Sequence, residues 1–482
     1  GLEHAHLDET LVATLPSSTI PAWVTAFSGV GPAHHGITGN EFFIRERREF
    51  AAPIPTTFED AAPVIACYTD DYLVKLREAP SLYDRIRKQD PNAQMWVAMH
   101  QYSAGADRLI TTSQTVLADA FHLFIEEQAR KRIEDKESRK MFQALDEHVV
   151  DAVSSQLDRH PDKLPDVLTV YLSGTDQYAH VAEEGPDKAR RSYLREVGEP
   201  LFKKLHEAMR KHNALANRYV LLTADHGHTE VKHDDPHSLA MKGETEPPRL
   251  MEKAGYRVRP FKLEVDPKDD FQSVLAYQGA IAYVYVADRT ACQAKGATCD
   301  WTAPPRFQED VVPLAEAFYR NNLDGSLVPE LKGTLDMVLT RQPRPHAQED
   351  LPFQVYVGDG KMVPVPAYLA AHPHPTYEDL DERLRDLAVG PFGERAGDIL
   401  LIAHNGDRTS SDERYYFATL YHSWHGSPSR DDSDIPLIVA HPGKSSQELA
   451  RLTHGAIGDR PKQQKFTDLV LTLRGLSARA PR

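Results

Sequence analysis

The chain has 482 residues and a formal net charge of −15 at neutral pH, from 56 basic and 71 acidic side chains. This length suits one large α/β unit with an insertion, or two to three domains. A large nucleic-acid-binding groove needs a basic face, and the sequence contains no basic block. No run of about 18 apolar residues occurs, so no transmembrane segment is expected.

The first informative stretch is "PSSTIPAWVTAFSGVGPAHHGITGN" at residues 16–40. Three hydroxyl side chains, Ser17, Ser18 and Thr19, precede an apolar segment at 23–27. One interpretation is a helix N-cap, in which a hydroxyl accepts from a free backbone N–H of the first turn. The other is a nucleophile at the positive end of a helix, where an anion would be stabilised. This stretch alone favours the cap, because caps are the commoner feature.

The next segments predict a mixture of helices and buried strands. "APVIACYT" around Cys67 is interpreted as a buried strand carrying a buried thiol. Residues 91–160 contain long helical stretches such as "SRKMFQALDEHVVDAVSSQL", and we expect this helical insertion to pack over a sheet edge.

Four apolar runs predict the main strands, and each ends in small, polar or charged residues. Their ranges are 166–174, 218–227, 398–406 and 435–443. Continuous apolar runs are typical of buried parallel strands, and ligands of open α/β sheets lie beyond the carboxyl ends of such strands. Between the first two runs, residues 187–212 show the apolar periodicity of a helix, which Pro200 should kink.

The segment 237–395 is richer in proline and charge and contains the weaker strands 279–286 and 353–358. It is interpreted as an inserted cap domain, which leaves 1–236 as the first part of a catalytic core and 396–482 as the last part. Within it, Cys292 and Cys299 bracket the polar loop "CQAKGATC". This spacing favours a local disulfide and hence a periplasmic or secreted protein, with a cytoplasmic one as the alternative.

Three short motifs with metal-binding residue types follow predicted strands. Asp176 and His180 in "GTDQYAHVAEEGP" are four residues apart, so one helical turn would place both on the same face. Asp225 and His226 end a strand in "TADHGH", and His425 precedes a glycine in "HSWHGSP". Carboxylate and imidazole ligands are typical of zinc, and three of them leave a position open for substrate. Each motif alone also fits a hydrogen-bonded polar pair at a strand end.

Together these motifs resemble the alkaline phosphatase superfamily, most closely its type I phosphodiesterase/nucleotide pyrophosphatase branch. The stretch "TIPAWVTAFSG…HHGITGN" keeps the proline two residues after Thr19 and the glycine ten after it. "DQYAHVAEEGP", "ADHG", "WHGSPSRDDSDIPLIV" and the closing "FTDLVLTLRGL" are similar to the later motifs of the family. Ala179 stands where the family usually has glycine, and Gly185-Pro186 is shifted two residues downstream.

The resemblance implies an α/β fold with a mostly parallel central sheet flanked by helices and an inserted cap domain. It also implies two zinc ions and a phosphoric ester hydrolase with Thr19 as nucleophile, leaving Ser17 or Ser18 as the helix cap. The ligand sets implied for the two ions are Asp176, His180 and His425 for one, and Asp225, His226 and Thr19 for the other.

One expected zinc ligand is missing from the second set. The family places an aspartate at the end of the first core strand, tens of residues before the nucleophile, whereas only 18 residues precede Thr19. Asp8 is a poor replacement, because it lies 11 residues upstream in a polar stretch. Either a strand lies outside this chain, which we favour, or the second zinc site is crippled.

The substrate-binding groups are the least defined part of the site. Ala22 replaces an asparagine that binds a phosphoryl oxygen in pyrophosphatases, so another donor is needed. Trp23 and Arg108 are the candidates. Three further histidines have no assigned ligand role: His34, His35 and His228.

The natural substrate is expected to be a small phosphate ester. A phosphodiesterase/nucleotide pyrophosphatase is the first hypothesis. A phosphomonoesterase or a phosphoryl-transfer enzyme of the same superfamily is the alternative. A sulfatase is disfavoured because Thr19 is followed by Ile-Pro-Ala. A metal-binding protein without activity is the remaining hypothesis if the second site is crippled, and the sequence indicates no oligomeric state.

Overall fold

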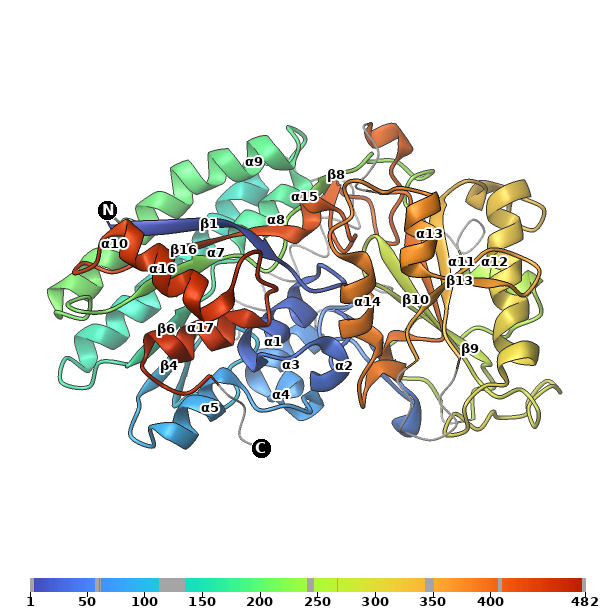
Figure 1. The fold of residues 1–482 in the computed structure, drawn as a ribbon, viewed down its shortest axis with the longest axis horizontal. Helices are drawn as coiled ribbons and strands as arrows, with labels where there is room; N and C mark the ends of the chain where they lie inside the picture. Colours follow the sequence, from blue (N-terminus) through green and yellow to red (C-terminus); the bar gives the residue numbers. More distant parts are fainter. Residues whose placement is uncertain are drawn as a thin grey trace.

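The computed structural model describes residues 4–56, 60, 62–111, 135–240, 247–266, 268–342, 351–405 and 410–478. Two regions lie side by side in Figure 1. One contains both described termini, β1 and most of the long helices; the other is built around β9 and β10.

The first region contains two three-stranded sheets. One has the order β1 (Ala5–Val12), β16 (Asp434–Ala440), β7 (Val220–Thr223), and both of its pairings are antiparallel. The other has the order β5 (Arg108–Ile110), β4 (Met95–Ala98), β6 (Val167–Val170), and both of its pairings are parallel.

The fold is therefore mixed α/β, and among the described strands the parallel ladders are those of β4 with β5 and with β6. The expectation of a mostly parallel central sheet is wrong for β16, which is antiparallel to both neighbours. An apolar run predicts a buried strand without giving its direction, because the same side chains are buried whichever way the strand runs.

Helices pack around these sheets; several of them share one apolar core with the strands, and residues of the helices at 135–211 form a second apolar cluster. All ten residues of α1 (Thr19–Ser28) are buried, and α1 packs against α17 (Lys465–Leu473). Helix α16 (Ser446–Ile457) lies along β1, as Figure 1 shows. The other helices of this region are α2 (Pro32–His35), α3 (Ala62–Thr69), α4 (Tyr72–Leu76), α5 (Leu82–Gln89), α7 (Asp135–Arg159), α8 (Gly174–Val181), α9 (Pro186–Tyr193), α10 (Glu199–Lys211) and α15 (Arg430–Ser433).

Strands β6 and β7 do not pair with each other within the described residues, but residues flanking the two strands come together at both ends. Arg218, just before β7, donates a hydrogen bond to the carbonyl oxygen of Pro165, just before β6. Tyr171 directly follows the end of β6, and Asp225 lies just after the end of β7. Burial and the nearby carboxylates of Asp225 and Asp176 raise the pKa of Tyr171 well above its usual value. Within the described residues, each strand pairs along one edge only, and every residue of both strands is partly exposed.

The second region is a six-stranded antiparallel sheet. Its order is β13 (Met362–Pro364), β12 (Gln354–Tyr356), β11 (Leu335–Thr340), β14 (Ile399–Ala403), β10 (Ile281–Val286), β9 (Ser273–Tyr277). Its helices are α11 (Pro247–Lys253), α12 (Val312–Asp324), α13 (Val365–Ala371) and α14 (Leu380–Ala388).

The strands expected at 279–286 and 353–358 are β10 and β12 of this sheet. The strand expected at 398–406 is β14, which pairs with β10 and β11 and so belongs to the same sheet. The sequence places it after the cap boundary at 395; the domain boundaries themselves stay predictions.

Two local sequence expectations are corrected by the structure. Cys67 is buried as expected, but it lies in α3, since a short apolar run reads equally well as helix or strand. The region 91–160, expected to be helical, begins with β4 and β5 before α7; residues 112–134 lie outside the described residues.

The helix expected at 187–212 is interrupted rather than continuous. A π-helical turn at Leu194–Gly198 separates α9 from α10, directly before Pro200. The proline ring cannot be accommodated by regular hydrogen bonding to the preceding turn, which accounts for the interruption.

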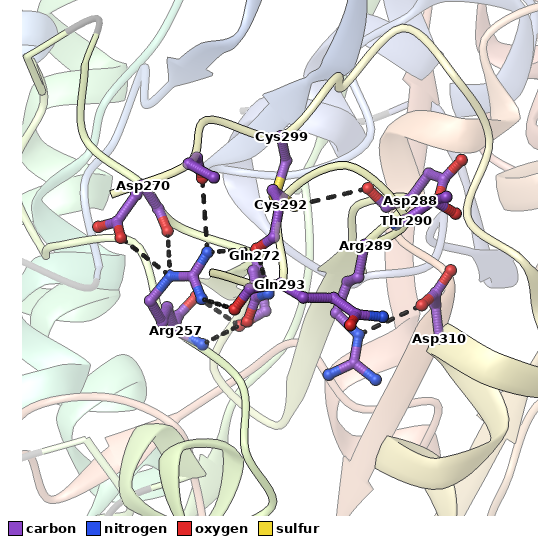
Figure 2. Close-up of a disulfide and its surroundings, with 12 residues drawn as sticks. Arg257, Asp270, Gln272, Asp288, Arg289, Thr290, Cys292, Gln293, Cys299 and Asp310 are labelled. Atoms are coloured by element: carbon purple, nitrogen blue, oxygen red, sulfur yellow. Dashed lines mark hydrogen bonds and ion pairs between the residues drawn. A yellow bond between two sulfur atoms is a disulfide. The ribbon is translucent and has the colours of Figure 1, made fainter. Parts of the chain in front are cut away.

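Cys292 and Cys299 form the expected disulfide, with their Cα atoms 4.9 Å apart. Figure 2 shows how Arg257 holds this loop. Its guanidinium donates to the Cys292 carbonyl oxygen at 2.6 Å and also pairs with Asp270. Gln272 donates to the same carbonyl oxygen at 2.9 Å, so the polar loop is fastened to the start of β9.

Candidate active site

Thr19 is the first residue of α1, and its side chain is almost completely buried at 6% exposure. Its Oγ1 lies 3.2 Å from Nε2 of His226. The expectation that Ser17 or Ser18 caps the helix is wrong: Ser18 is the N-cap residue, but its hydroxyl makes no capping bond. Asn40 takes that role by accepting from the Ile20 backbone N–H at 3.0 Å.

The two serines instead hold the turn before α1 in place. The Ser17 hydroxyl donates to the Ser427 carbonyl oxygen at 3.0 Å and accepts from Arg383 at 2.8 Å. The Ser18 hydroxyl donates to the carbonyl oxygen of Gln278, between β9 and β10 of the second sheet, at 3.4 Å. The start of α1 is thus fixed from both regions of the molecule.

Asp176 and His180 lie one turn apart on α8, as their spacing predicts, with Asp176 Oδ1 3.6 Å from His180 Nε2. Helix α8 can start here because Gly174 has no side chain. A Cβ at this position would lie 1.9 Å from the Tyr193 hydroxyl and 2.4 Å from the Asp146 carboxylate.

Asp225 and His226 directly follow β7. His226 Nε2 lies 3.5 Å from Asp225 Oδ2 and 4.0 Å from Asp176 Oδ1, so it joins the two carboxylates. Asp225 Oδ2 is buried and has no hydrogen-bond partner within the described part of the chain. A buried carboxylate oxygen without a donor is costly, which makes a cation a fitting partner for it.

His425 follows the short strand β15 (Ser423–Trp424), which pairs with β8 (Thr229–Glu230). Its ring stacks on that of His226, with the centroids 3.7 Å apart. The chain leaves His425 through Gly426 at φ +105°, where a Cβ would lie 1.9 Å from the Gln278 carbonyl oxygen. Only glycine suits both the conformation and this close approach.

Three histidines are oriented in the same way. Nδ1 of His180, His226 and His425 lies 2.8, 3.0 and 2.9 Å from a backbone carbonyl oxygen, of Ser423, Gly227 and Ser17 respectively. A carbonyl oxygen only accepts, so each Nδ1 carries the proton and each Nε2 keeps its lone pair. This is how proteins fix the tautomer of a metal-ligating histidine.

At this cluster, the described residues form two groups that could hold a metal ion, and both use Asp176. One group is Asp176, His180 and His425, the same three residues that the family resemblance implies for one zinc ion. The other group is Asp176, His226 and His228. In each group one donor atom from every residue lies within 4.8 Å of the others. The donor chemistry fits a divalent cation such as zinc.

Burial and mutual charge shift the pKa values of the clustered residues in both directions. Burial raises the pKa of Asp225, whereas nearby histidines, His180 first, outweigh burial and lower that of Asp176. Burial and neighbouring histidines lower the pKa of His425 well below its usual value. The pKa of His226 is raised, because the carboxylates of Asp225 and Asp176 outweigh the effect of its burial.

His228 is the residue that the sequence left without a role. Its Nε2 lies 2.8 Å from Asp176 Oδ1, and its Nδ1 lies 3.1 Å from the Ser423 hydroxyl. The signal was present in "DHGH", where a second imidazole follows the first by two residues and so points near it.

The other candidates lie outside this group. Trp23 is one turn after Thr19 and packs edge-on against His100 and Tyr171. Arg108 in β5 bonds to Gln156 and lies over the Trp96 ring, and its substrate role stays a prediction.

Three residues singled out in the sequence have other surroundings. Asp8 lies on β1 beside His6 and His454 rather than at the cluster. His35 is buried against Thr25 at 2.9 Å, and burial lowers its pKa to about 3. His34 is exposed. Among the described residues, the carboxylates that pair with the clustered histidines are Asp176 and Asp225.

Comparison with known proteins gives this geometry a family. The model of the type I phosphodiesterase/nucleotide pyrophosphatase family matches residues 3–309. Murine ectonucleotide pyrophosphatase/phosphodiesterase 5 has a similar fold, with 12% identity, a TM-score of 0.50, and coverage of 100% of this chain and 90% of that one. An inactive threonine-to-alanine variant of it in complex with AMP gives the same values. No curated protein matches the chain in sequence.

The matched family and the Asp/His groups define a metal-dependent phosphoester hydrolase of the alkaline phosphatase superfamily. Within that class, the chain belongs to the type I phosphodiesterase/nucleotide pyrophosphatase family. Of the helices in the described ranges, none is long and apolar enough to cross a bilayer.

Proposed function

We propose that this protein is a zinc-dependent phosphodiesterase or nucleotide pyrophosphatase that works through a phospho-threonine at Thr19. The observation that carries the proposal is the buried Thr19 hydroxyl at the start of α1, 3.2 Å from the lone-pair nitrogen of His226. The proposed nucleophile is thus within contact distance of a proposed metal ligand.

Two zinc ions are proposed. Asp176, His180 and His425 would hold one, and Asp225, His226 and the Thr19 oxygen would hold the other. His228 is an alternative ligand of the second zinc ion, because it forms a possible ligand group with Asp176 and His226. When bound, such ions supply positive charge that favours an alkoxide nucleophile and offsets the charge of the phosphoryl and leaving oxygens.

The chain's own residues account for the remaining steps. The Thr19 hydroxyl would lose its proton to solvent, its oxygen would bond to phosphorus, and the bond from phosphorus to the ester oxygen would break, so that this oxygen leaves as an alcohol with a proton from solvent. Water would then bond to phosphorus, the bond from phosphorus to the Thr19 oxygen would break, and a proton from the water would restore the Thr19 hydroxyl. The three backbone carbonyl oxygens that fix the imidazole tautomers keep each Nε2 aimed at the cluster throughout, so no ligand has to reorient.

The second zinc ion would have three ligands from the described residues, namely Asp225, His226 and Thr19. The family's aspartate at the end of the first core strand has no counterpart at the cluster among the described carboxylates that pair with its histidines. If the second site stays incomplete, the chain would bind one metal ion and lack activity. Metal content and activity separate these alternatives.

The disulfide supports an exported protein, periplasmic or secreted, because such bonds persist in oxidising compartments. The second region is proposed to act as the cap. Its turn between β9 and β10 touches the site, where Ala280 donates to the His425 carbonyl oxygen at 3.1 Å. The substrate class is expected to be set there and by Trp23.

The deciding experiment measures hydrolysis of a nitrophenyl phosphodiester and of the corresponding monoester by zinc-loaded protein. A preference for the diester supports the proposal, and a preference for the monoester favours the phosphatase alternative. A chiral diester should be cleaved with net retention at phosphorus, since two displacements occur. Net inversion would mean that water attacks directly and that no phospho-threonine forms.

Metal analysis tests the ligand assignment separately. His425→Ala should lose about one zinc ion per chain relative to the unaltered protein and lose activity at least about 100-fold. The matched control is His34→Ala, an exposed histidine that should keep both. Equal zinc content in His425→Ala and the unaltered protein would refute the assignment.

A further inference from the structure

A second group of metal-ligand residues lies on the edge strand of the first sheet, apart from the active-site cluster. His6 and Asp8 are two residues apart on β1, so their side chains point to the same face. His454, in the last turn of α16, faces them, and the His6 and His454 ring centroids are 5.6 Å apart. One donor atom from each of the three lies within 4.8 Å of the others.

Two potential donor atoms of this group have no hydrogen-bond partner among the described residues. These atoms are His6 Nε2 and Asp8 Oδ2, and both are buried. Asp8 as a whole is only 5% exposed. Leaving a buried carboxylate oxygen and a buried imidazole nitrogen unpaired is unfavourable unless something else binds them.

The remaining atoms of these side chains are held in place. Asp8 Oδ1 accepts from the Thr10 backbone N–H at 2.8 Å and from its hydroxyl at 2.7 Å, which leaves Oδ2 for a ligand. His454 Nδ1 lies 2.9 Å from Asp459 Oδ1. A carboxylate on Nδ1 keeps the proton there and presents Nε2, the arrangement found behind metal-bound histidines.

We propose that His6, Asp8 and His454 form a binding site for a divalent transition-metal ion, with zinc as the best fit. Two imidazoles and one carboxylate are a zinc donor set, whereas calcium and magnesium prefer oxygen ligands alone. Ligand atoms on one tetrahedral zinc lie about 3.3–3.5 Å apart. Because the three donor atoms already lie within 4.8 Å of one another, at most about 1.5 Å of side-chain movement brings them to these separations. The His454 side chain is 44% exposed, so water can complete the shell.

This site would be structural rather than catalytic. Strand β1 is at the edge of its sheet, and the ion would fasten it to the end of α16. An ion that binds only the folded protein stabilises it. The inference does not depend on the proposed function, because none of the three residues belongs to the active-site cluster.

The test uses full-length protein freed of metal with a chelator and then titrated with Zn²⁺ alone. His6→Ala and His454→Ala should each bind one zinc ion fewer per chain than the unaltered protein. Phosphodiester hydrolysis at saturating zinc should stay within twofold. Equal zinc content in the unaltered protein and in both variants would overturn the proposal. The matched control is His148→Ala, since His148 is exposed on α7 and should leave the zinc content unchanged.

Two further measurements keep the result independent of folding defects and of the active site. Asp8→Asn retains an oxygen for Thr10 but loses the charge, and it should weaken zinc binding at this site at least tenfold. In an Asp176→Ala, His226→Ala, His425→Ala background, in which both proposed active-site ions lose ligands, Co²⁺ should still give the absorption of a four-coordinate site. That absorption should disappear when His454→Gln is added. A spectrum unchanged by His454→Gln would also refute the site.

Discussion

The two regions of the molecule bury different kinds of side chain. In the second region, β10 and β14 are apolar or tyrosine-containing strands whose residues are all buried. In the first region, β6 and β7 are equally apolar but partly exposed at every residue, while ionisable groups such as His180, Asp225 and His425 are buried just beyond strand ends. We infer that the second region mainly supplies stability and that the first region gives up some stability to hold the candidate chemistry.

The largest effect is expected from Thr19→Ala in the first region. Loss of the proposed nucleophile should lower kcat about 10³-fold or more, while stability changes by only about 1 kcal/mol. Steady-state kinetics and chemical denaturation measure the two quantities. Ser18→Ala is the matched control, since it removes a buried hydroxyl beside Thr19 that contacts Gln278 instead of His226. Full activity of Thr19→Ala would show that another group is the nucleophile.

The opposite outcome is expected from Leu401→Ala in β14. Leu401 is fully buried at 0% exposure in the six-stranded sheet. Removing its side chain should lower the free energy of unfolding by about 2–5 kcal/mol, because it leaves a cavity. The activity of the folded protein should stay unchanged. Leu7→Ala, at a half-exposed leucine, should cost far less, and a similar loss at both positions would contradict the comparison.

A smaller loss of stability is expected when the disulfide is removed. The Cys292→Ala, Cys299→Ala double variant lacks a cross-link of sequence separation 7, which should cost about 2–3 kcal/mol in thermal or chemical unfolding. Diester hydrolysis should be retained. Thiol counting on denatured, unreduced protein supplies the control and should find one thiol, that of Cys67. Three thiols would show that the bridge does not form.

The smallest effect is expected on the pH dependence of stability, which Asp146 in the first region should change. Burial raises the pKa of Asp146 to about 7, despite hydrogen bonds from Tyr193 at 2.9 Å and from Gly174. An unfolded aspartate titrates near pH 3.9, so between about pH 4 and 7 the folded state binds more protons than the unfolded state. Stability contributed by this group therefore falls as pH rises through that window.

Asp146→Asn should remove that dependence. From pH 5 to pH 8, the unaltered protein should lose about 2 kcal/mol more of its free energy of unfolding than the variant does. Denaturant unfolding at both pH values measures the difference. Asp158→Asn, at a surface aspartate, should behave like the unaltered protein. The same pH dependence in Asp146→Asn and the unaltered protein would mean that Asp146 is ionised in the folded state.

The sequence predicts features of this protein that depend on local pattern. Apolar runs correctly predicted the strands β6, β7, β14 and β16. The four-residue spacing of Asp176 and His180 correctly predicted that both lie on one face of a helix. The Cys292–Cys299 spacing gave the disulfide. Each of these depends on residues that are close together in the chain.

Features that depend on distant contacts were missed. Asn40 caps α1 from 20 residues away, and no local rule places its amide at Ile20. The antiparallel direction of β16 and its pairing with β1 depend on how the chain returns to the sheet. His228 was overlooked because its bond to Asp176 spans 52 residues.

The edges of β6 and β7 that are unpaired within the described residues have a consequence for the binding of a further strand. The side chain of Arg218 links the residues before the two strands, and Tyr171 and Asp225 lie near each other after them. Unpaired strand edges expose backbone N–H and C=O groups that another extended segment can bind. A segment inserted between them would join the two three-stranded sheets into one seven-stranded layer. One end of such a segment would lie beside Asp225, next to the residues proposed to bind metal.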